Sequence, residues 1–158
     1  MNAVETREFP PQPVVSIRQT IPTADLIATE GQSLQELWRL LRDRGITPAG
    51  PPFVRYHTFD AGETDVEIGV PVTDNVVGEG RVVGTELPGG PAVTTVHLGA
   101  HDRLGEAYRR IAEAVATRGQ ANGPGWEIYE WIDLTQEPNP ASWPAPSDWR
   151  TELVQPIK

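Results

Sequence analysis

The segment Glu67-Ile68-Gly69-Val70-Pro71-Val72 returns near the end of the chain as Glu152-Leu153-Val154-Gln155-Pro156-Ile157. The first of these segments alternates polar and apolar residues, which is typical of a strand with one wet and one buried face. Other features recur in the same order and support an internal duplication. They are the helix-ending glycines Gly45 and Gly119, the strand starts Phe53 and Trp126, and the tyrosines Tyr56 and Tyr129.

Each copy reads as strand, helix, strand, strand. The first helix is predicted to begin at a capping box, Ser33 to Glu36, and to end at Gly45. The second is predicted to begin after an Asp102 cap and to end at Gly119. The expected fold is therefore α+β: two pseudo-twofold related units share an antiparallel sheet, and two main helices flank a central ligand groove.

Proline and glycine clusters set the expected domain organisation. Residues 1–12 are predicted to be an extended lead-in, and residues 13–158 a single domain with repeats at about 13–80 and 81–158. A proline-rich excursion from Pro138 to Pro146 contains Trp143 and interrupts the second copy.

The composition and charge of the chain exclude several classes of function. The 158 residues are 38% hydrophobic and 22% charged, as expected for one soluble domain with its own core. Thirteen basic and 22 acidic side chains give a net charge of −9, which disfavours nucleic acid and favours cationic ligands. The lack of cysteine excludes thiol nucleophiles and Cys-ligated metals. Neither a membrane span nor a signal peptide is evident, so a cytoplasmic protein is expected.

The strand expected from Trp126 to Ile132 carries the main candidate chemistry. Alternation puts Glu127, Tyr129 and Trp131 on one face, a carboxylate between large aromatic rings. Such a pocket suits a lipophilic cation, because aromatic faces attract cations and the carboxylate supplies the counter-charge. The other candidate ligand-binding residues are Tyr56, Trp38, Tyr108 and His57.

Simpler interpretations compete with this one. Any single aromatic residue is more typical of a core, and Glu127 fits an exposed edge strand as well. Glu67 and Glu152 could instead pair with Arg55 or Arg150 and hold the two copies together. No metal and no cofactor are expected, because the sequence shows no metal-binding or nucleotide-binding motif of the required spacing.

The chain resembles the GyrI-like small-molecule-binding domains, which are related to the effector-binding domains of BmrR-type and AraC-type multidrug regulators. The segments that carry the resemblance are Gly50–Tyr56, Asp65–Val72, Gly125–Tyr129, Trp149–Leu153 and Pro156-Ile157. The resemblance implies paired βαββ-type units around a central groove. It also implies that Glu127 corresponds to the acidic residue at the base of the regulators' drug pocket. Because the regulators' DNA-binding domain has no counterpart here, a stand-alone member is expected.

Three functions follow. The first is a binder of hydrophobic, often cationic, aromatic compounds, acting in sequestration or drug resistance. The second, implied by the resemblance, is a hydrolase of cyclopropane-bearing DNA-alkylating natural products, with Glu127 activating water and Tyr129 donating a hydrogen bond. The third is an acidic protein-interaction module like the gyrase-inhibitory relatives. The first is preferred, with small molecules as partners and with neither nucleic acid nor membrane bound directly.

Overall fold

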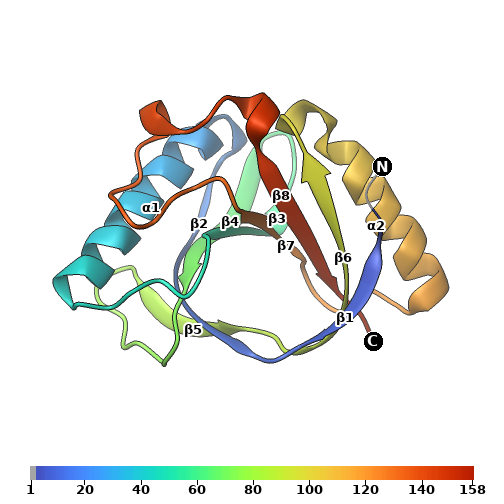
Figure 1. Cartoon of the computed structure of the whole chain (residues 1–158), viewed down its shortest axis with the longest axis horizontal. Coiled ribbons are helices and arrows are strands. Elements are labelled where there is room, and N and C mark those ends of the chain that lie inside the picture. Colours follow the sequence, from blue (N-terminus) through green and yellow to red (C-terminus); the bar gives the residue numbers. More distant parts are fainter. Residues whose placement is uncertain (1–2) are drawn as a thin grey trace.

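One antiparallel sheet runs through the whole protein, with the strand order β1-β6-β8-β7-β3-β4-β2-β5 (Figure 1). The computed structural model describes residues 3–158. Its strands are β1 (Glu5–Phe9), β2 (Gln12–Pro22), β3 (Phe53–Phe59), β4 (Glu63–Pro71), β5 (Val83–Leu87), β6 (Gly90–Leu98), β7 (Trp126–Tyr129) and β8 (Arg150–Pro156). The helices are α1 (Leu26–Asp43) and α2 (Leu104–Arg118), and four 3₁₀ turns accompany them: Thr23–Asp25, His101–Arg103, Pro140–Ser142 and Pro146–Asp148.

The strand order confirms the duplicated α+β architecture. Exchanging β1 with β5, β2 with β6, β3 with β7 and β4 with β8 reproduces the same order read from the other end. The copies meet at the centre, where β3 pairs with β7 and Val54 lies opposite Glu127. The outermost strands cross between copies, since β1 pairs with β6 and β5 pairs with β2. Part of the expected N-terminal lead-in is therefore a strand, β1, that joins the far copy.

The first helix begins earlier than the sequence predicted. It starts at Leu26, after the 3₁₀ turn Thr23–Asp25, so Ser33 lies within the helix instead of capping it. Ser33 is fully buried, and its hydroxyl accepts a hydrogen bond from the Gln19 amide at 3.4 Å. The capping-box prediction was wrong because the residues before Ser33 extend the same helix by two turns.

The second helix also begins differently from the prediction. The turn His101–Arg103 precedes α2, and Asp102 makes no capping hydrogen bond to it. Both helix ends agree with the sequence. Gly45 follows α1 with a positive φ of 67°, which closes the helix, and Gly119 caps α2.

Each helix covers the outer strands of its own copy. Helix α1 packs on β2 and β4, and α2 packs on β6 and β8. Separate apolar clusters fill these two layers, and a third lies on the far face of the sheet. The two helices lie apart over the two halves of the sheet, with the central strands β3 and β7 between them (Figure 1). A cavity lies there, lined by residues of both helices and of both central strands. This cavity is the central groove that the predicted fold required.

The proline-rich excursion packs against α1. The Trp38 indole N–H donates to the Leu134 carbonyl at 2.9 Å, and the Gln35 amide donates to the Pro138 carbonyl at 3.2 Å. Gly31 allows this close approach, because a Cβ there would lie 3.2 Å from Cγ of Pro140. Within residues 3–158, neither helix combines the length and the apolar character needed to cross a membrane.

Candidate functional site

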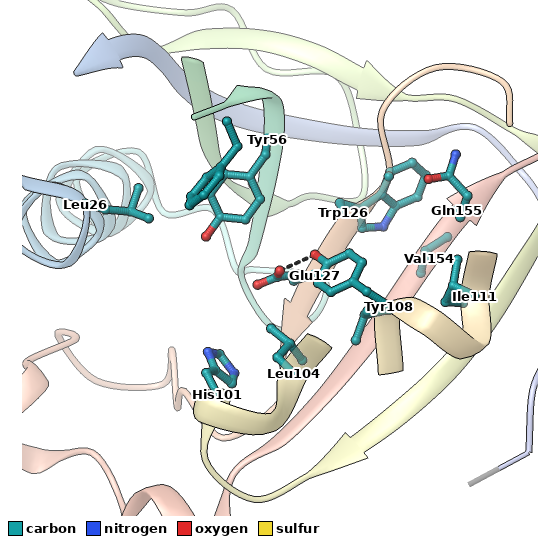
Figure 2. Close-up of a pocket in the computed structure, with 13 residues that line it drawn as sticks. Leu26, Tyr56, His101, Leu104, Tyr108, Ile111, Trp126, Glu127, Val154 and Gln155 are labelled. Carbon is teal, nitrogen blue, oxygen red and sulfur yellow. Dashed lines mark hydrogen bonds between the residues drawn. The ribbon is translucent and has the colours of Figure 1, made fainter. Parts of the chain in front are cut away.

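A cavity of about 490 Å³ lies in the groove between the two helices (Figure 2). This volume is in the range of small-molecule sites. Apolar and aromatic side chains dominate its wall, and no lysine or arginine is among the described residues that line it. The lining residues are Leu26, Tyr56, Phe59, His101, Leu104, Tyr108, Ile111, Gly125, Trp126, Glu127, Leu153, Val154 and Gln155.

Glu127 is the carboxylate of this cavity. It sits on β7 in the middle of the sheet and is only 3% exposed, so the edge-strand interpretation is excluded. Its carboxylate accepts hydrogen bonds from the Tyr129 hydroxyl at 2.8 Å and from the Tyr108 hydroxyl. Burial raises the pKa of Glu127, and the two hydroxyl donors oppose that rise. No basic side chain within residues 3–158 pairs with it.

Two tyrosines from opposite copies face this carboxylate. Tyr56 comes from β3 and Tyr108 from α2, and both line the cavity (Figure 2). Burial, followed by the charge of Glu127, raises the pKa of each phenol, so both remain neutral hydroxyls. Tyr108 is 43% exposed and lies at the mouth of the cavity. The pair therefore offers ring faces and hydroxyl donors without adding charge.

Glu30 is a half-buried acidic side chain on the helix that contributes Leu26 to the cavity, although it is not itself among the lining residues, and the sequence analysis did not consider it. It lies on α1 one turn after Leu26, which lines the cavity, and one turn before the buried Leu34. Burial, together with the charge of Glu127, raises the pKa of Glu30 to about 8. The apolar stripe of the full helix would have revealed this position, but the predicted helix began after it.

A stack of aromatic rings supports the wall behind Glu127. Trp131 stacks on Tyr129 with centroids 4.5 Å apart and on Trp149 with centroids 4.4 Å apart. The planes of Trp131 and Trp149 are nearly parallel, at 4°, and those of Trp131 and Tyr129 are tilted by 25°. Trp131 thus packs against protein rings and does not line the cavity. Strand β7 ends at Tyr129 and the chain turns there, so the predicted strand to Ile132 was too long.

His101 connects this stack to the cavity. Its ring lies within 5.1–5.4 Å of Tyr129, Trp131 and Trp149, and it also lines the cavity. Its Nε2 and the Thr151 hydroxyl are 2.8 Å apart. Burial, then the charge of His97, lowers the pKa of His101, so the imidazole is neutral at pH 7.

Three of the seven predicted site residues, Glu127, Tyr56 and Tyr108, line the cavity, and four do not. Tyr129 and Trp131 belong to the aromatic stack behind Glu127. The other two lie farther away. Trp38 packs beneath the excursion after β7, with Arg42 over its ring at 5.3 Å from the centroid. His57 bonds to Glu67, with 2.8 Å between Nε2 and Oε1. Neither residue lines the cavity described here.

The expected arginine partners of Glu67 and Glu152 were wrong. Glu67 accepts a hydrogen bond from Ser16 at 2.7 Å as well as contacting His57, and Arg55 instead donates to the Pro124 carbonyl. Glu152 lies 3.8 Å from Arg7, a residue of the crossing strand β1. The pairing with Arg7 does join the two copies, through a strand that the sequence analysis did not recognise.

Fold and cavity together define a class of protein: a small-molecule-binding domain built from two βαββ units, with its site at the seam between them. The chain belongs to the GyrI-like family, since residues 2–158 match the GyrI-like small molecule binding domain. No curated protein sequence matches the chain.

Solved structures share this fold. The EcmrR C-terminal domain has a TM-score of 0.75 and 25% identity, with 100% of this chain and 98% of that chain covered. EcmrR in its complex with DNA has a TM-score of 0.79 and 22% identity, with 99% of this chain and 57% of that chain covered. SAV2435 bound to tetraphenylphosphonium has a TM-score of 0.63 and 14% identity, with 99% of this chain and 94% of that chain covered. This chain thus spans little more than half of the EcmrR chain.

Proposed function

We propose that the central cavity binds hydrophobic aromatic cations with broad specificity, and that the protein acts by sequestering such compounds and thereby conferring drug resistance. One observation carries the proposal: Glu127 is buried at an aromatic cavity wall, and its only described partners are tyrosine hydroxyls. A buried carboxylate without a counter-cation is costly, and a bound cation relieves that cost.

The shape of the wall supports broad specificity. Flat rings and aliphatic groups hold apolar ligands mainly through contact area. The polar side chains among the described lining residues are few: one carboxylate, one imidazole, one indole, one amide and two tyrosine hydroxyls. Tetraphenylphosphonium, the ligand in the structure of the similar protein SAV2435, combines four aromatic rings with one delocalised positive charge. It is therefore a suitable first probe for this cavity.

The test compares three ligands of similar character and different charge. These are tetraphenylphosphonium, neutral triphenylphosphine oxide and anionic tetraphenylborate. Binding is followed by the fluorescence of the tryptophans, because Trp126 lines the cavity. We expect the order cation, neutral compound, anion, from tightest to weakest. Equal affinity for all three ligands would contradict the proposal.

Two variants assign the charge effect to Glu127. Glu127→Gln should weaken tetraphenylphosphonium binding about 10- to 100-fold, since a charge-assisted contact is worth roughly 1.5–3 kcal/mol, and it should leave the neutral ligand unchanged. Glu113→Gln on the exposed face of α2 changes the net charge equally and should have no effect. If both variants weakened binding alike, the overall field and not the cavity would be responsible.

The sequestering role is tested in cells. Expression of the wild type should raise the tolerance of the host to tetraphenylphosphonium, and expression of Glu127→Gln to the same level should not. Equal protection by both proteins would separate tolerance from this cavity and would contradict the role in resistance.

The same carboxylate favours a second candidate function, hydrolysis of a reactive cyclopropane-bearing electrophile. Glu127 has a raised pKa and lies beside two phenolic donors, a combination suited to taking a proton from water as it attacks. Water would add to a ring carbon, the strained carbon–carbon bond would break, and the proton would pass to the opened product. Turnover that is lost in Glu127→Gln would support this activity, and a panel of such compounds without turnover would exclude it.

A further inference from the structure

An exposed aromatic ring, Phe59, lies at the wall of the central cavity. It comes from the end of β3, lines the cavity, and is 61% exposed. Its ring meets the Tyr56 ring edge to face, with centroids 5.5 Å apart and an interplanar angle of 84°. Covering such a ring removes apolar surface from water, so a ligand that packs on Phe59 gains affinity.

Regular alternation along β3 would turn Phe59 away from the cavity. Successive side chains of a strand point to opposite faces, so Thr58, and not Phe59, would share the face of Tyr56. The pairing of β3 with β4 departs from this pattern, because its register shifts between Tyr56 and Thr58. His57 is therefore an extra residue of β3, and it forms a β-bulge.

The bulge reverses the alternation of the residues that follow it. Tyr56 lies opposite Val66 of β4, and Phe59 lies opposite Thr64. Val66 and Thr64 are two residues apart, so they share a face of the sheet, and their directly opposite partners share that face with them. The bulge thus places Phe59 on the cavity side together with Tyr56, in agreement with the contact between their rings.

Contacts on both sides of the bulge fix this geometry. On the face away from the cavity, Nε2 of His57 lies 2.8 Å from Oε1 of the buried Glu67. Beyond Phe59, the Thr23 hydroxyl donates to the Asp60 carbonyl at 2.7 Å and ties the end of β3 to the turn that precedes α1. The ring of Phe59 is therefore held at the cavity before a ligand arrives, which lowers the entropic cost of binding.

We propose that the β-bulge at His57 makes Phe59 a ligand-binding residue, and that Phe59 selects compounds with several aromatic rings over compact cations. One ring of the ligand packs on Phe59 while the ligand occupies the cavity beside Glu127. The inference rests on the proposed function, because it concerns the same cavity. It assigns two properties of the ligand to two residues: Glu127 responds to charge, and Phe59 responds to aromatic surface.

Calorimetric titrations with three ligands test the role of Phe59. These are tetraphenylphosphonium, neutral triphenylphosphine oxide, and tetraethylphosphonium, a compact cation without rings. Phe59→Ala should weaken binding of the first two about 10-fold, since the ring contact does not require charge. It should leave the affinity for tetraethylphosphonium and the melting temperature unchanged. Equal losses for all three ligands would mean general damage to the cavity and would overturn the selection.

Leu98→Ala is the matched control for the loss of an exposed apolar side chain. Leu98 is 60% exposed and is not among the described residues that line the cavity. All three affinities should stay at their wild-type values in this variant. A loss like that of Phe59→Ala would show that the effect does not come from the cavity and would overturn the inference.

An exchange of two neighbouring residues tests the bulge itself. The double substitution Thr58→Phe with Phe59→Thr keeps the composition and the chain length, and both positions are exposed, so the variant is expected to fold. With the bulge, position 58 lies opposite Asp65, on the face away from the cavity. The exchange should therefore weaken tetraphenylphosphonium binding as much as Phe59→Ala does. Preserved affinity would mean that position 58 faces the cavity, and it would overturn the role of the bulge.

The outcomes separate this inference from the function on which it rests. Equal affinity of the wild type for tetraphenylphosphonium and triphenylphosphine oxide, with both weakened in Phe59→Ala, would contradict the charge preference of the proposed function and support the role of Phe59. Unchanged affinity of Phe59→Ala for both ligands would overturn this inference alone. Failure of every ligand to bind the wild type would contradict both.

Discussion

Glu67 and Glu127 are both buried glutamates of one sheet, yet they lie on opposite faces and in different surroundings. Glu67 on β4 is 6% exposed, and Ser16 and His57 both lie within hydrogen-bond distance of its carboxylate. Glu127 on β7 is 3% exposed, lies at a cavity, and within residues 3–158 is hydrogen-bonded only to two tyrosine hydroxyls. Burial alone therefore does not identify a binding site. What distinguishes Glu127 is that its carboxylate lies beside a cavity and has only tyrosine hydroxyls as described partners.

A second comparison is between the equivalent positions of the two copies. The position equivalent to Glu127 in the first copy is Val54, and the two residues lie opposite each other across the central strand pair. The apolar member belongs to the core beneath α1, and the acidic member faces the groove. Tyrosines occur at the next equivalent positions of both copies, Tyr56 and Tyr129, so both halves contribute phenols to one asymmetric site.

The largest effect expected from this comparison is on folding stability. Glu67→Ala leaves the fully buried Ser16 hydroxyl without its acceptor and removes the partner of His57. The free energy of unfolding should fall by about 2–4 kcal/mol. Glu127→Gln should change it by less than about 1 kcal/mol, since the amide oxygen still accepts a tyrosine hydroxyl. Urea denaturation at pH 7 measures both, and equal losses would remove the distinction between the two carboxylates.

Glu30 sharpens the comparison through the pH dependence of stability. Its pKa in the folded protein is about 8, above the ordinary 4.5, so the folded state binds the proton more tightly than the unfolded chain. Wild-type stability should therefore decline as the pH rises from about 4.5 to about 8 and stay low above that. At pH 9, Glu30→Gln should be more stable than the wild type by at least about 1 kcal/mol, and at pH 4 the two should be alike.

Thermal unfolding across this pH range provides the measurement. Glu36→Gln serves as the control, because it alters the same residue type at an exposed position of α1. Its stability curve should keep the shape of the wild-type curve. A Glu30→Gln curve that also falls between pH 5 and pH 8 would show that Glu30 is not the group that titrates.

The duplicated fold could be predicted because its signals are local and repeated. Alternation identifies β4, Gly45 and Gly119 mark the helix ends, and the recurrence of one order of elements identifies the second copy. Alternation also placed Glu127 and Tyr129 on one face of their strand, but it did not decide whether that strand lay at the centre or at the edge of the sheet. Pairing of β1 with β6 could not be predicted, because nothing in residues 5–9 specifies a partner more than 80 positions away.

Other features near the site could not be predicted, because tertiary contacts determine where α1 begins and where β7 ends. Helix α1 begins at Leu26, and its first turns pack against Pro140, which is distant in the sequence. The helix predicted to begin at Ser33 therefore omitted Leu26 and Glu30. Strand β7 stops at Tyr129, where the stacking of Trp131 on Trp149 favours a turn. Amphipathic pattern predicts which face of an element is buried more reliably than where the element begins or ends.

The smallest expected effects on ligand affinity come from removing either of the two tyrosine hydroxyls that donate hydrogen bonds to Glu127. Tyr129→Phe removes a buried donor that lies 2.8 Å from the carboxylate, and water has little access to replace it. Its loss should raise the pKa of Glu127 further and weaken tetraphenylphosphonium binding about 3- to 10-fold at pH 6. The loss should be smaller at pH 8, because a larger share of the carboxyl is ionised at higher pH in both proteins.

Tyr108→Phe provides the matched comparison, since it removes the other donor to the same carboxylate. Tyr108 is 43% exposed, so water can take the place of its hydroxyl, and the affinity should fall by only about twofold. Titrations of both variants at pH 6 and pH 8, with triphenylphosphine oxide as the neutral reference, measure the difference. A larger loss in Tyr108→Phe that does not vary with pH would mean that this hydroxyl contacts the ligand directly. In that case Glu127 would be held chiefly by Tyr129, the donor from its own strand.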